Sequence, residues 1–316
     1  MKKLKIFIPL IIGFFLIWYT YNKLSPGELA NLQQHFLKAN YFYVVLAMFL
    51  GFLSHLSRAY RWKYTLEPMG YTSSYANNFM AVGVAYLMNL AIPRSGEVSR
   101  ALVLSKYENV PFEKGFGTIV AERIADFIIL MSLILIAVIS EFNVFLEFLE
   151  NKSINTNKYI LFSVVGVCIF LLAFFVLKRA KSKLGQKIKK FILGLKEGVL
   201  TIITMKNKWQ FIAHTIFIWT MYLSMFYVCF FAIPETSHVS FGTAITAFVM
   251  GALAVSFTNG GIGSYPLLVA EALVVFGIDY TSGTAFGWIV WTSQTLLVVA
   301  YGIFSFVFLP IYNKNS

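Results

Sequence analysis

The chain has 316 residues, of which 58% are hydrophobic and 13% charged, so it has too few polar side chains to cover a water-soluble domain. Its 26 lysines and arginines against 14 aspartates and glutamates give a formal charge of +12, which in a membrane chain indicates orientation and attraction to anionic lipids rather than nucleic-acid binding. Polar stretches reach only about 20 to 30 residues, and a separate domain needs about 50, so we expect 1–316 to form a single integral membrane domain.

Apolar runs long enough to cross a bilayer predict six full transmembrane helices. Their ranges are 6–21, 41–56, 117–139, 159–177, 210–233 and 283–309. The first run follows three lysines and has no small-residue cleavage site, so we expect a retained helix rather than a cleaved signal peptide.

Two further apolar segments are interrupted by residues that end helices. The first, about 75–107, breaks between Pro93 and Glu97, and the second, about 241–277, breaks at a glycine-rich sequence. Each limb after a break has roughly 7 to 11 residues, which at about 1.5 Å per residue is too short to cross about 30 Å. We therefore predict an all-α polytopic membrane protein with about six full spans and two re-entrant helical hairpins. Two full crossings per segment, giving ten helices, are the alternative.

Lysine and arginine are concentrated in segments that we place in the cytoplasm. These include the amino terminus, the loop after the second span with Arg58, Arg61 and Lys63, and the segment 178–208 with ten cations. The acid-rich segment 141–158 suits the outside. These placements agree only if each interrupted segment crosses an even number of times, which leaves both termini in the cytoplasm.

The two halves of the chain resemble each other. Each has an asparagine near its break, Asn89 or Asn259, and then a span that opens with a glycine, Gly117 or Gly283. Because the hairpins would enter from opposite faces, we expect an inverted repeat with a substrate site at its interface near mid-membrane. Between the halves, lysines and apolar residues at helical spacing predict a basic interfacial helix at about 178–200, on the cytoplasmic leaflet.

Six charged residues fall within 33 positions of the first hairpin and the next span, where charge is costly and tends to be paired. They are Arg94, Glu97, Arg100, Glu122, Arg123 and Asp126. Their spacing predicts a contact between Glu97 and Arg100. The set is expected to clamp the hairpin to the next span, to bind a lipid phosphate through an arginine fork and backbone N–H groups at the break, or to do both.

The second break contains Gly260, Gly261 and Gly263, which we expect to form an unwound tip whose backbone groups line a cavity. It lacks the Lys-Ser/Thr of a nucleotide-binding loop. Glu271, the one acid in the apolar segments of the second half, is expected either to couple to protons or to pair with an arginine of the first hairpin. The histidines and cysteines lack ligand spacing, so no metal and no cofactor is expected.

Three short motifs carry a family resemblance. In chain order they are Pro93-x-x-Gly96-Glu97-x-x-Arg100, Glu122-Arg123-x-x-Asp126 and Gly260-Gly261-Ile262-Gly263. Over nearly its whole length the chain resembles the transmembrane region of lysylphosphatidylglycerol synthases, also called the flippase-like or UPF0104 family. Members often have an acid soon after the glycine run, where this chain has Ser264-Tyr265-Pro266.

The resemblance implies that the membrane region moves an aminoacylated lipid between leaflets. Full-length members carry an aminoacyltransferase domain after this region, and because the chain ends at Ser316 we expect a stand-alone membrane domain. Related membrane domains accompany polyprenyl-phosphate glycosyltransferases, so the cargo is expected to be a phospholipid or a lipid-linked sugar.

The predicted function is translocation of a phosphate-bearing lipid across the cytoplasmic (inner) membrane. Candidate substrate-binding residues are Asn89, Arg94, Arg100, Arg123, Gly260, Gly261 and Gly263. Candidate network and proton-coupling residues are Glu97, Glu122, Asp126 and Glu271. Expected partners are membrane lipids with anionic headgroups, a separately encoded lipid synthase or glycosyltransferase, and a second copy of the chain, but no nucleic acid.

Two other functions remain open. One is a membrane-embedded transferase or hydrolase acting on a lipid phosphate, with Glu122 or Asp126 as general base. The sequence has no evident nucleophile or metal constellation within reach of a base, which disfavours an enzyme. The other is a scaffold or regulator for a separately encoded lipid synthase.

Overall fold

A computed structural model describes residues 4–92, 94–142, 144, 186, 202–256 and 258–314. Within these residues every regular element is helical, which confirms the predicted all-α fold. The α-helices are α1 (Leu4–Lys23), α2 (Pro26–Lys38), α3 (Tyr41–Arg61), α4 (Lys63–Leu66), α5 (Tyr75–Ala91), α6 (Gly96–Tyr107), α7 (Phe112–Ser140), α11 (Lys208–Cys229), α12 (Phe241–Ala254), α13 (Ser264–Val275) and α14 (Tyr280–Tyr312). Short 3₁₀ turns are η1 (Glu67–Met69), η2 (Phe230–Ala232), η3 (Pro234–Thr236) and η4 (Asn259–Gly261).

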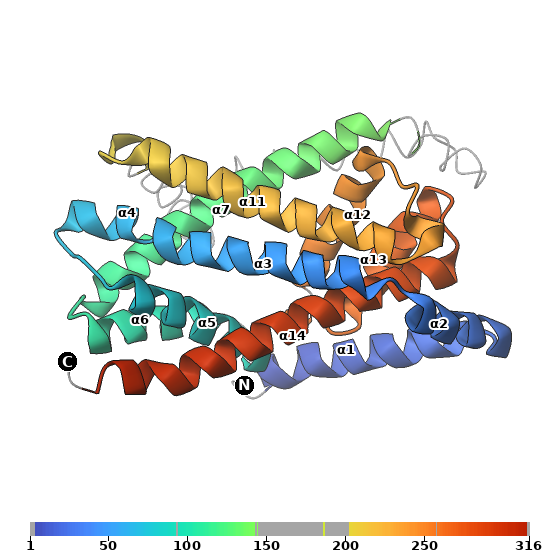
Figure 1. The fold of residues 1–316 in the computed structure, drawn as a ribbon, viewed down its shortest axis with the longest axis horizontal. Helices are drawn as coiled ribbons and strands as arrows, with labels where there is room; N and C mark the ends of the chain where they lie inside the picture. The colour runs from blue at the N-terminus through green and yellow to red at the C-terminus, as the bar shows by residue number, and fades with distance from the viewer. Residues whose placement is uncertain are drawn as a thin grey trace.

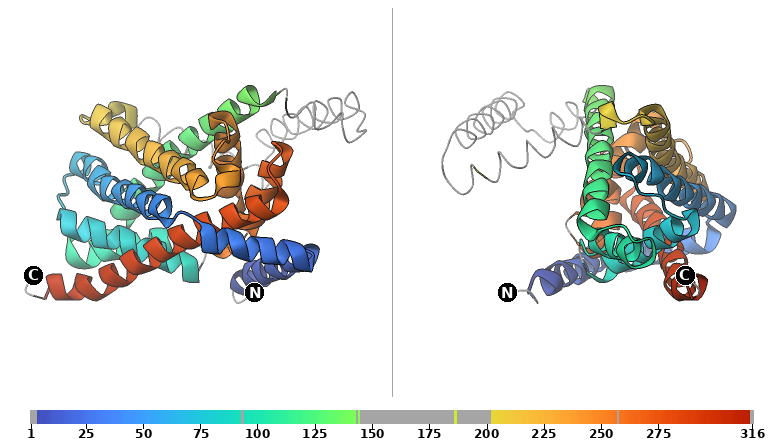
Figure 2. Two further views of the ribbon diagram at one scale, coloured as in Figure 1. Left: turned by 45° about the vertical axis from the view of Figure 1, so that its right-hand side comes forward. Right: turned by 90° about the vertical axis from the view of Figure 1, so that its left-hand side faces the viewer.

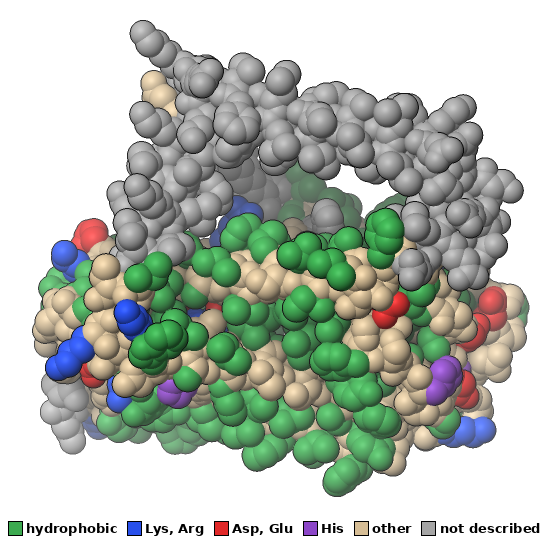
Figure 3. All heavy atoms as spheres, turned by 90° about the horizontal axis from the view of Figure 1, so that it is seen from above, with side chains coloured by type: hydrophobic (Ala, Val, Ile, Leu, Met, Phe, Trp, Pro, Cys, Tyr) green, Lys and Arg blue, Asp and Glu red, His purple; other side chains and the backbone are tan. Residues whose placement is uncertain are grey.

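Four helical stretches in the described residues are long and apolar enough to cross a membrane. They are Tyr41–Met69, Phe112–Ser140, Lys208–Ala232 and Tyr280–Tyr312. Seen from above, apolar side chains cover the middle of the molecule and most charged side chains gather toward its two ends (Figure 3). This distribution is the one expected when the long axis of a polytopic protein follows the bilayer normal.

Helices α3, α7, α11 and α14 coincide with four of the predicted spans, and α1 covers the first apolar run. The predicted span at 159–177 and most of the acid-rich segment 141–158 lie outside the described residues. So does the predicted interfacial helix at 178–200, apart from the helical residue Gln186. The total number of spans and the placement of the termini stay predictions.

The two interrupted segments form pairs of short helices, α5 with α6 and α12 with α13. In Figure 1 the first pair lies at the end of the molecule where the chain finishes, and the second pair lies toward the opposite end. Their tips meet between these ends. A Cβ added to Gly260 in the second tip would lie 2.6 Å from Leu90 Cδ2, close to the end of α5. The hairpins therefore approach each other from opposite directions.

The first tip satisfies its own backbone groups. Asn89 Oδ1 accepts a hydrogen bond from the Gly96 N–H at 2.8 Å. Ser95 Oγ donates to the carbonyls of Met88 and Ile92 at 2.9 and 2.7 Å. Such internal partners are needed because hydrocarbon offers none. Asn89, a candidate for binding substrate, therefore closes the turn in this structure.

The second tip depends on glycine conformations. Gly260, Gly261 and Gly263 have φ of 60°, 79° and 70°, a region that side-chain-bearing residues rarely occupy. Trp291 Nε1 of α14 donates to the Gly260 carbonyl at 2.8 Å and holds the tip against that helix. The predicted unwound tip is thus present, packed against α14.

Helices α3, α5, α6 and α7 repeat as α11, α12, α13 and α14. Several packing contacts in one set have counterparts in the other: α6 packs on α7 as α13 packs on α14, and α5 packs on α14 as α12 packs on α7. Helices α3 and α11 lie side by side and run in opposite directions (Figures 1 and 2). This exchange is the arrangement that the predicted inverted repeat requires.

An apolar cluster fixes the helices around the candidate site. Trp62, Leu104 and Ile119 are each at most 1% exposed and pack together between α3, α6 and α7. Trp62 Nε1 also donates to Thr118 Oγ1 at 2.8 Å. The ends of α3 and α6 are thereby held against the first turns of α7.

Candidate functional site

Five charged side chains are buried together where α3, α6 and α7 meet, and we call them the arginine cluster. They are Arg58 and Arg61 of α3, Arg100 of α6, and Glu122 and Asp126 of α7. None is more than 7% exposed. Three cations face two anions, so the cluster carries a formal charge of +1.

The two carboxylates link the three guanidinium groups into one chain. Glu122 Oε2 accepts hydrogen bonds from Arg100 Nη1 at 2.8 Å and from Arg61 Nη2 at 3.4 Å. Asp126 accepts from Arg58 Nη1 at 2.7 Å and from Arg61 Nη1 at 3.1 Å. Arg61 therefore bridges both acids, and removing either acid would leave a buried cation poorly compensated.

A more exposed ion pair lies at the edge of the cluster. Arg123 Nη2 is 3.1 Å from Glu97 Oε1, and the two side chains are 44% and 25% exposed. The predicted contact between Glu97 and Arg100 is therefore wrong. Residues three apart on a helix differ by about 60° around its axis. Helix α7 offers each a separate partner, Arg123 for Glu97 and Glu122 for Arg100.

Aromatic rings and a hydroxyl hold the buried guanidinium groups. The Trp62 ring centre lies 3.6 Å from Arg100 Cζ, and the Phe211 ring centre lies 5.0 Å from Arg61 Cζ. Arg61 Nη1 donates to Thr215 Oγ1 at 2.8 Å. Cation–π contacts are strongest when the cation is removed from water, so these rings stabilise the charges where they stand.

Buried polar groups continue from the cluster along α3, α5 and α11. Arg58 Nη2 lies 3.5 Å from the Tyr222 hydroxyl, which lies 3.1 Å from the Tyr86 hydroxyl. The His55 ring centre is 4.7 Å from that of Tyr86. Since Tyr86 belongs to the last turns of α5, this polar line leads from the cluster toward the first hairpin tip.

Arg58 and Arg61 were expected in a cytoplasmic loop, and that placement is wrong. Helix α3 continues to Arg61 and turns both guanidinium groups inward. The signal available in the sequence was the spacing of three that joins His55, Arg58 and Arg61, which places them near one face of a helix. In the structure this face of α3 packs against the face of α7 that carries Glu122 and Asp126.

Arg94 does not join the cluster. It is exposed in the turn between α5 and α6, and it forms no ion pair with any residue that the structure describes. Its φ of 62° lies in the left-handed region, which is unfavourable for arginine. Backbone conformations of this kind are more frequent at functional sites than elsewhere.

The second-half candidates lie elsewhere. Gly260 meets Leu90 of α5, and Gly263 lies against Gly13 and Ile17 of α1. Glu271 is 45% exposed and pairs with Lys23 at 2.8 Å. Its expected pairing with an arginine of the first hairpin is therefore wrong, because α1 packs against α13 and supplies the cation.

The described residues contain no group of three or more His, Cys, Asp and Glu side chains that could hold a metal ion. The chemistry available at the cluster is recognition of an anion. Guanidinium groups bind carboxylates and phosphates in a planar, bidentate manner.

The family model of the lysylphosphatidylglycerol synthase TM region matches residues 6–302. A UPF0104 membrane protein of Methanocaldococcus jannaschii is 31% identical over 153 residues, which cover 48% of this chain and 44% of that protein. Another, of Methanothermobacter thermautotrophicus, is 26% identical over 181 residues, covering 54% of this chain and 49% of that protein.

These two matches span about half the length of the curated relatives. No solved structure matches the chain. The predicted resemblance is confirmed, and the chain belongs to the family of the lysylphosphatidylglycerol synthase TM region.

Proposed function

We propose that this membrane protein moves a phosphate-bearing lipid between the leaflets of the cytoplasmic membrane. The observation that carries the proposal is the surplus of buried arginine. Three guanidinium groups share two carboxylates, and the Nε atoms of Arg58, Arg61 and Arg100 are buried without a hydrogen-bond partner among the described residues. An uncompensated cation inside a membrane is costly, and a lipid phosphate would neutralise it while accepting those N–H groups.

The hairpins support a transport function. Two interrupted helix pairs that approach from opposite ends and meet at their tips form the type of repeat interface at which transporters bind substrate. Each pair can in principle open toward a different face, so a headgroup held between the pairs would have a route to both leaflets. The polar line from Arg58 through Tyr222 to Tyr86 extends toward this junction.

Arg94 is proposed as the residue that receives the headgroup at the first tip. Its side chain is exposed, and its backbone pays about 1 kcal/mol for a left-handed conformation that glycine would adopt freely. The presence of an arginine there despite this cost favours a use for the side chain.

The geometry disfavours the enzymatic alternative. Glu122 and Asp126 were the candidate general bases, and the oxygens of both already accept hydrogen bonds from arginines. A carboxylate committed to guanidinium groups is a weak base. The scaffold alternative predicts that the purified chain has no lipid-exchange activity of its own, which the following experiment examines.

The test is exchange of a labelled phosphatidylglycerol between leaflets of proteoliposomes containing the purified chain. Arg94→Lys keeps the charge but loses the bidentate fork, so exchange should fall about tenfold, as for loss of one charge-assisted hydrogen bond. Arg94→Gly relaxes the backbone and removes the side chain, so exchange should fall further while the melting temperature stays equal or rises.

The matched control is Asn109→Gly. Asn109 is the other described non-glycine residue with positive φ, at 54°, and it lies outside the candidate site. Its replacement should leave exchange at the wild-type rate. Equal exchange by wild type, Arg94→Lys and Arg94→Gly would contradict the role of Arg94, and no exchange by wild type would favour the scaffold function.

A further inference from the structure

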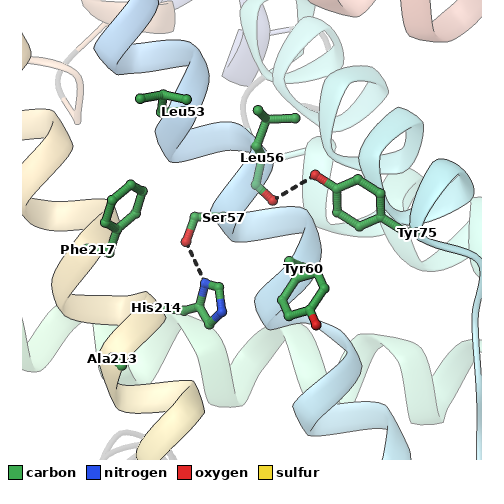
Figure 4. A pocket seen from close by; sticks show the side chains of 8 residues that line it. All are labelled: Leu53, Leu56, Ser57, Tyr60, Tyr75, Ala213, His214 and Phe217. Atoms are coloured by element: carbon green, nitrogen blue, oxygen red, sulfur yellow. Dashed lines mark hydrogen bonds between the residues drawn. The ribbon is translucent and has the colours of Figure 1, made fainter.

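A groove with a volume of about 510 Å³ opens between α3 and α11 (Figure 4). One end is apolar and is formed by Leu53, Leu56 and Phe217. The other end is polar and contains His214 and Tyr60. From Leu53 to Tyr60 the helix rises about 10 Å, so the lining changes from apolar to polar over roughly one third of a bilayer core.

A hydrogen bond orders the polar end. Ser57 Oγ and His214 Nδ1 are 2.8 Å apart, and Figure 4 shows the second ring nitrogen of His214 turned toward Tyr60. When Ser57 donates to Nδ1, the His214 Nε2 carries the proton and becomes a donor. Lys63 does not line the groove, but its Nζ lies 2.7 Å from the hydroxyl of the lining residue Tyr60, so an ammonium group adjoins the polar end.

The groove shares its wall with the arginine cluster. Ser57 adjoins Arg58 on α3, and His214 adjoins Thr215, which accepts a hydrogen bond from Arg61. Only the contact between α3 and α11 separates the polar end from the buried guanidinium groups. An anion in the groove would therefore be separated from the cluster by the packed side chains of α3 and α11.

The groove faces the surroundings of the protein rather than its interior. Phe217 is 42% exposed, and Tyr60 and Tyr75 at the other rim are 39% and 44% exposed. A groove that opens on the apolar surface, and whose polar end adjoins the ammonium group of Lys63, fits a molecule with a hydrocarbon chain and an anionic head. A second groove of about 490 Å³ lies between α2, α3 and α14. Among the described residues, neither groove has a lysine, arginine or acid in its lining, but only the first has a histidine there and a lining residue, Tyr60, in contact with a lysine.

We propose that the groove between α3 and α11 binds one phospholipid. Its phosphate lies between Lys63 and His214, and an acyl chain lies along Leu53 and Phe217. This inference rests on the proposed function, for which the groove is the site where a lipid waits before its head reaches the arginine cluster.

The test is native mass spectrometry of the purified full chain in detergent, titrated with phosphatidylglycerol or with diacylglycerol, which has the same chains and no phosphate. The wild type should retain one phosphatidylglycerol and bind diacylglycerol about tenfold more weakly, as for loss of a charge-assisted contact. Lys63→Ala should weaken phosphatidylglycerol binding by a similar factor. Ala213→Trp, which fills the groove, should weaken the binding of both lipids.

The matched control is Ile216→Trp, a substitution on the same helix at a residue that is 54% exposed and lies outside the groove lining. It should bind phosphatidylglycerol like the wild type, and thermal melting of all variants confirms that they are folded. Wild-type binding by both Lys63→Ala and Ala213→Trp would overturn the inference. So would a dimer in the wild type that Ala213→Trp dissociates, since a second copy of the chain would then occupy the groove.

The transport proposal and the groove proposal can be contradicted independently of each other. Normal lipid binding with no leaflet exchange in proteoliposomes would contradict transport and leave the groove as a lipid site. Leaflet exchange that depends on Arg94, together with unchanged binding in the groove variants, would support transport and overturn the groove.

Discussion

Glu122 receives two buried arginines, Arg61 and Arg100, and is itself 1% exposed. A buried ion pair adds little net stability compared with well-packed apolar residues, because the cost of removing both charges from water offsets their attraction. Its removal has a larger effect, since the partners then remain charged and buried. The cluster is therefore sensitive to the loss of single members and tolerant of balanced losses.

We predict that Glu122→Gln lowers the free energy of unfolding by about 3 to 5 kcal/mol. The folded yield and the melting temperature should fall with it. The double variant Glu122→Gln with Arg100→Gln should recover part of this loss, because one cation leaves with the anion. Glu113→Gln, at an exposed position in the first turn of the same helix, is the control and should change little. Detergent melting curves measure all three, and additive losses in the double variant would show that the residues are not partners.

The exposed edge pair should behave differently. Glu97 and Arg123 are 25% and 44% exposed, so water screens their attraction. We predict that Glu97→Gln costs at most about 1 kcal/mol of stability. Melting of Glu97→Gln beside Glu122→Gln checks the ranking, and an equal loss in both would mean that Glu97 is as deeply buried in the membrane as the cluster.

At the scale of helices, close contacts through glycine hold the first hairpin against α14. A Cβ on Gly302 would lie 2.5 Å from Leu87 Cβ and 3.0 Å from the Gly83 carbonyl oxygen. Small residues at such crossings let membrane helices approach until their backbones pack. The position of α5, and with it the polar line at Tyr86, depends on this contact.

We predict that Gly302→Ala destabilises the protein by about 1 to 3 kcal/mol, because the added methyl group forces α5 and α14 apart. Gly117→Ala is the matched control, since a Cβ there has no neighbour within 4 Å. Thermal melting in one detergent compares the two. An equal effect of both substitutions would mean that helix propensity, rather than the crossing, determines the outcome.

At the scale of the whole molecule, the two helix sets and the distribution of charge define two ends. Helix α4 and the end of α14 lie at one end, and α2 lies at the other (Figure 1). The positive-inside rule, applied to the basic segments, predicts that the end with α4 and Lys314 faces the cytoplasm. With that orientation, one hairpin of the inverted repeat would enter from each face.

We predict that a cysteine at Lys314 is labelled by an impermeant maleimide only after cells are opened. A cysteine at the exposed Gln34 of α2 should react in intact cells. Both substitutions are made in a chain with Cys168 and Cys229 replaced by alanine, so that the maleimide cannot label the native thiols. Labelling of residue 314 in intact cells would reverse the orientation.

Much of the architecture was predictable because its signals are local. Hydropathy marks a span, and proline or glycine inside an apolar run marks a break, so both interrupted segments could be located from their own residues. The motifs at Gly96, Glu122 and Gly260 likewise indicated the family without any knowledge of packing. An inverted repeat was predicted from the parity of crossings and the charge of the loops, and the parity itself stays a prediction.

The partners of the charges were decided by tertiary structure alone. Arg58 and Asp126 are 68 positions apart, and Lys23 and Glu271 are 248 positions apart, so only helix packing brings them together. Local spacing suggested Glu97 with Arg100, but α7 offered each a different partner. The sequence by itself determined which segments enter the membrane, because that depends on the composition of each segment. Which charges meet inside it depends on how the helices cross, and this required the folded structure.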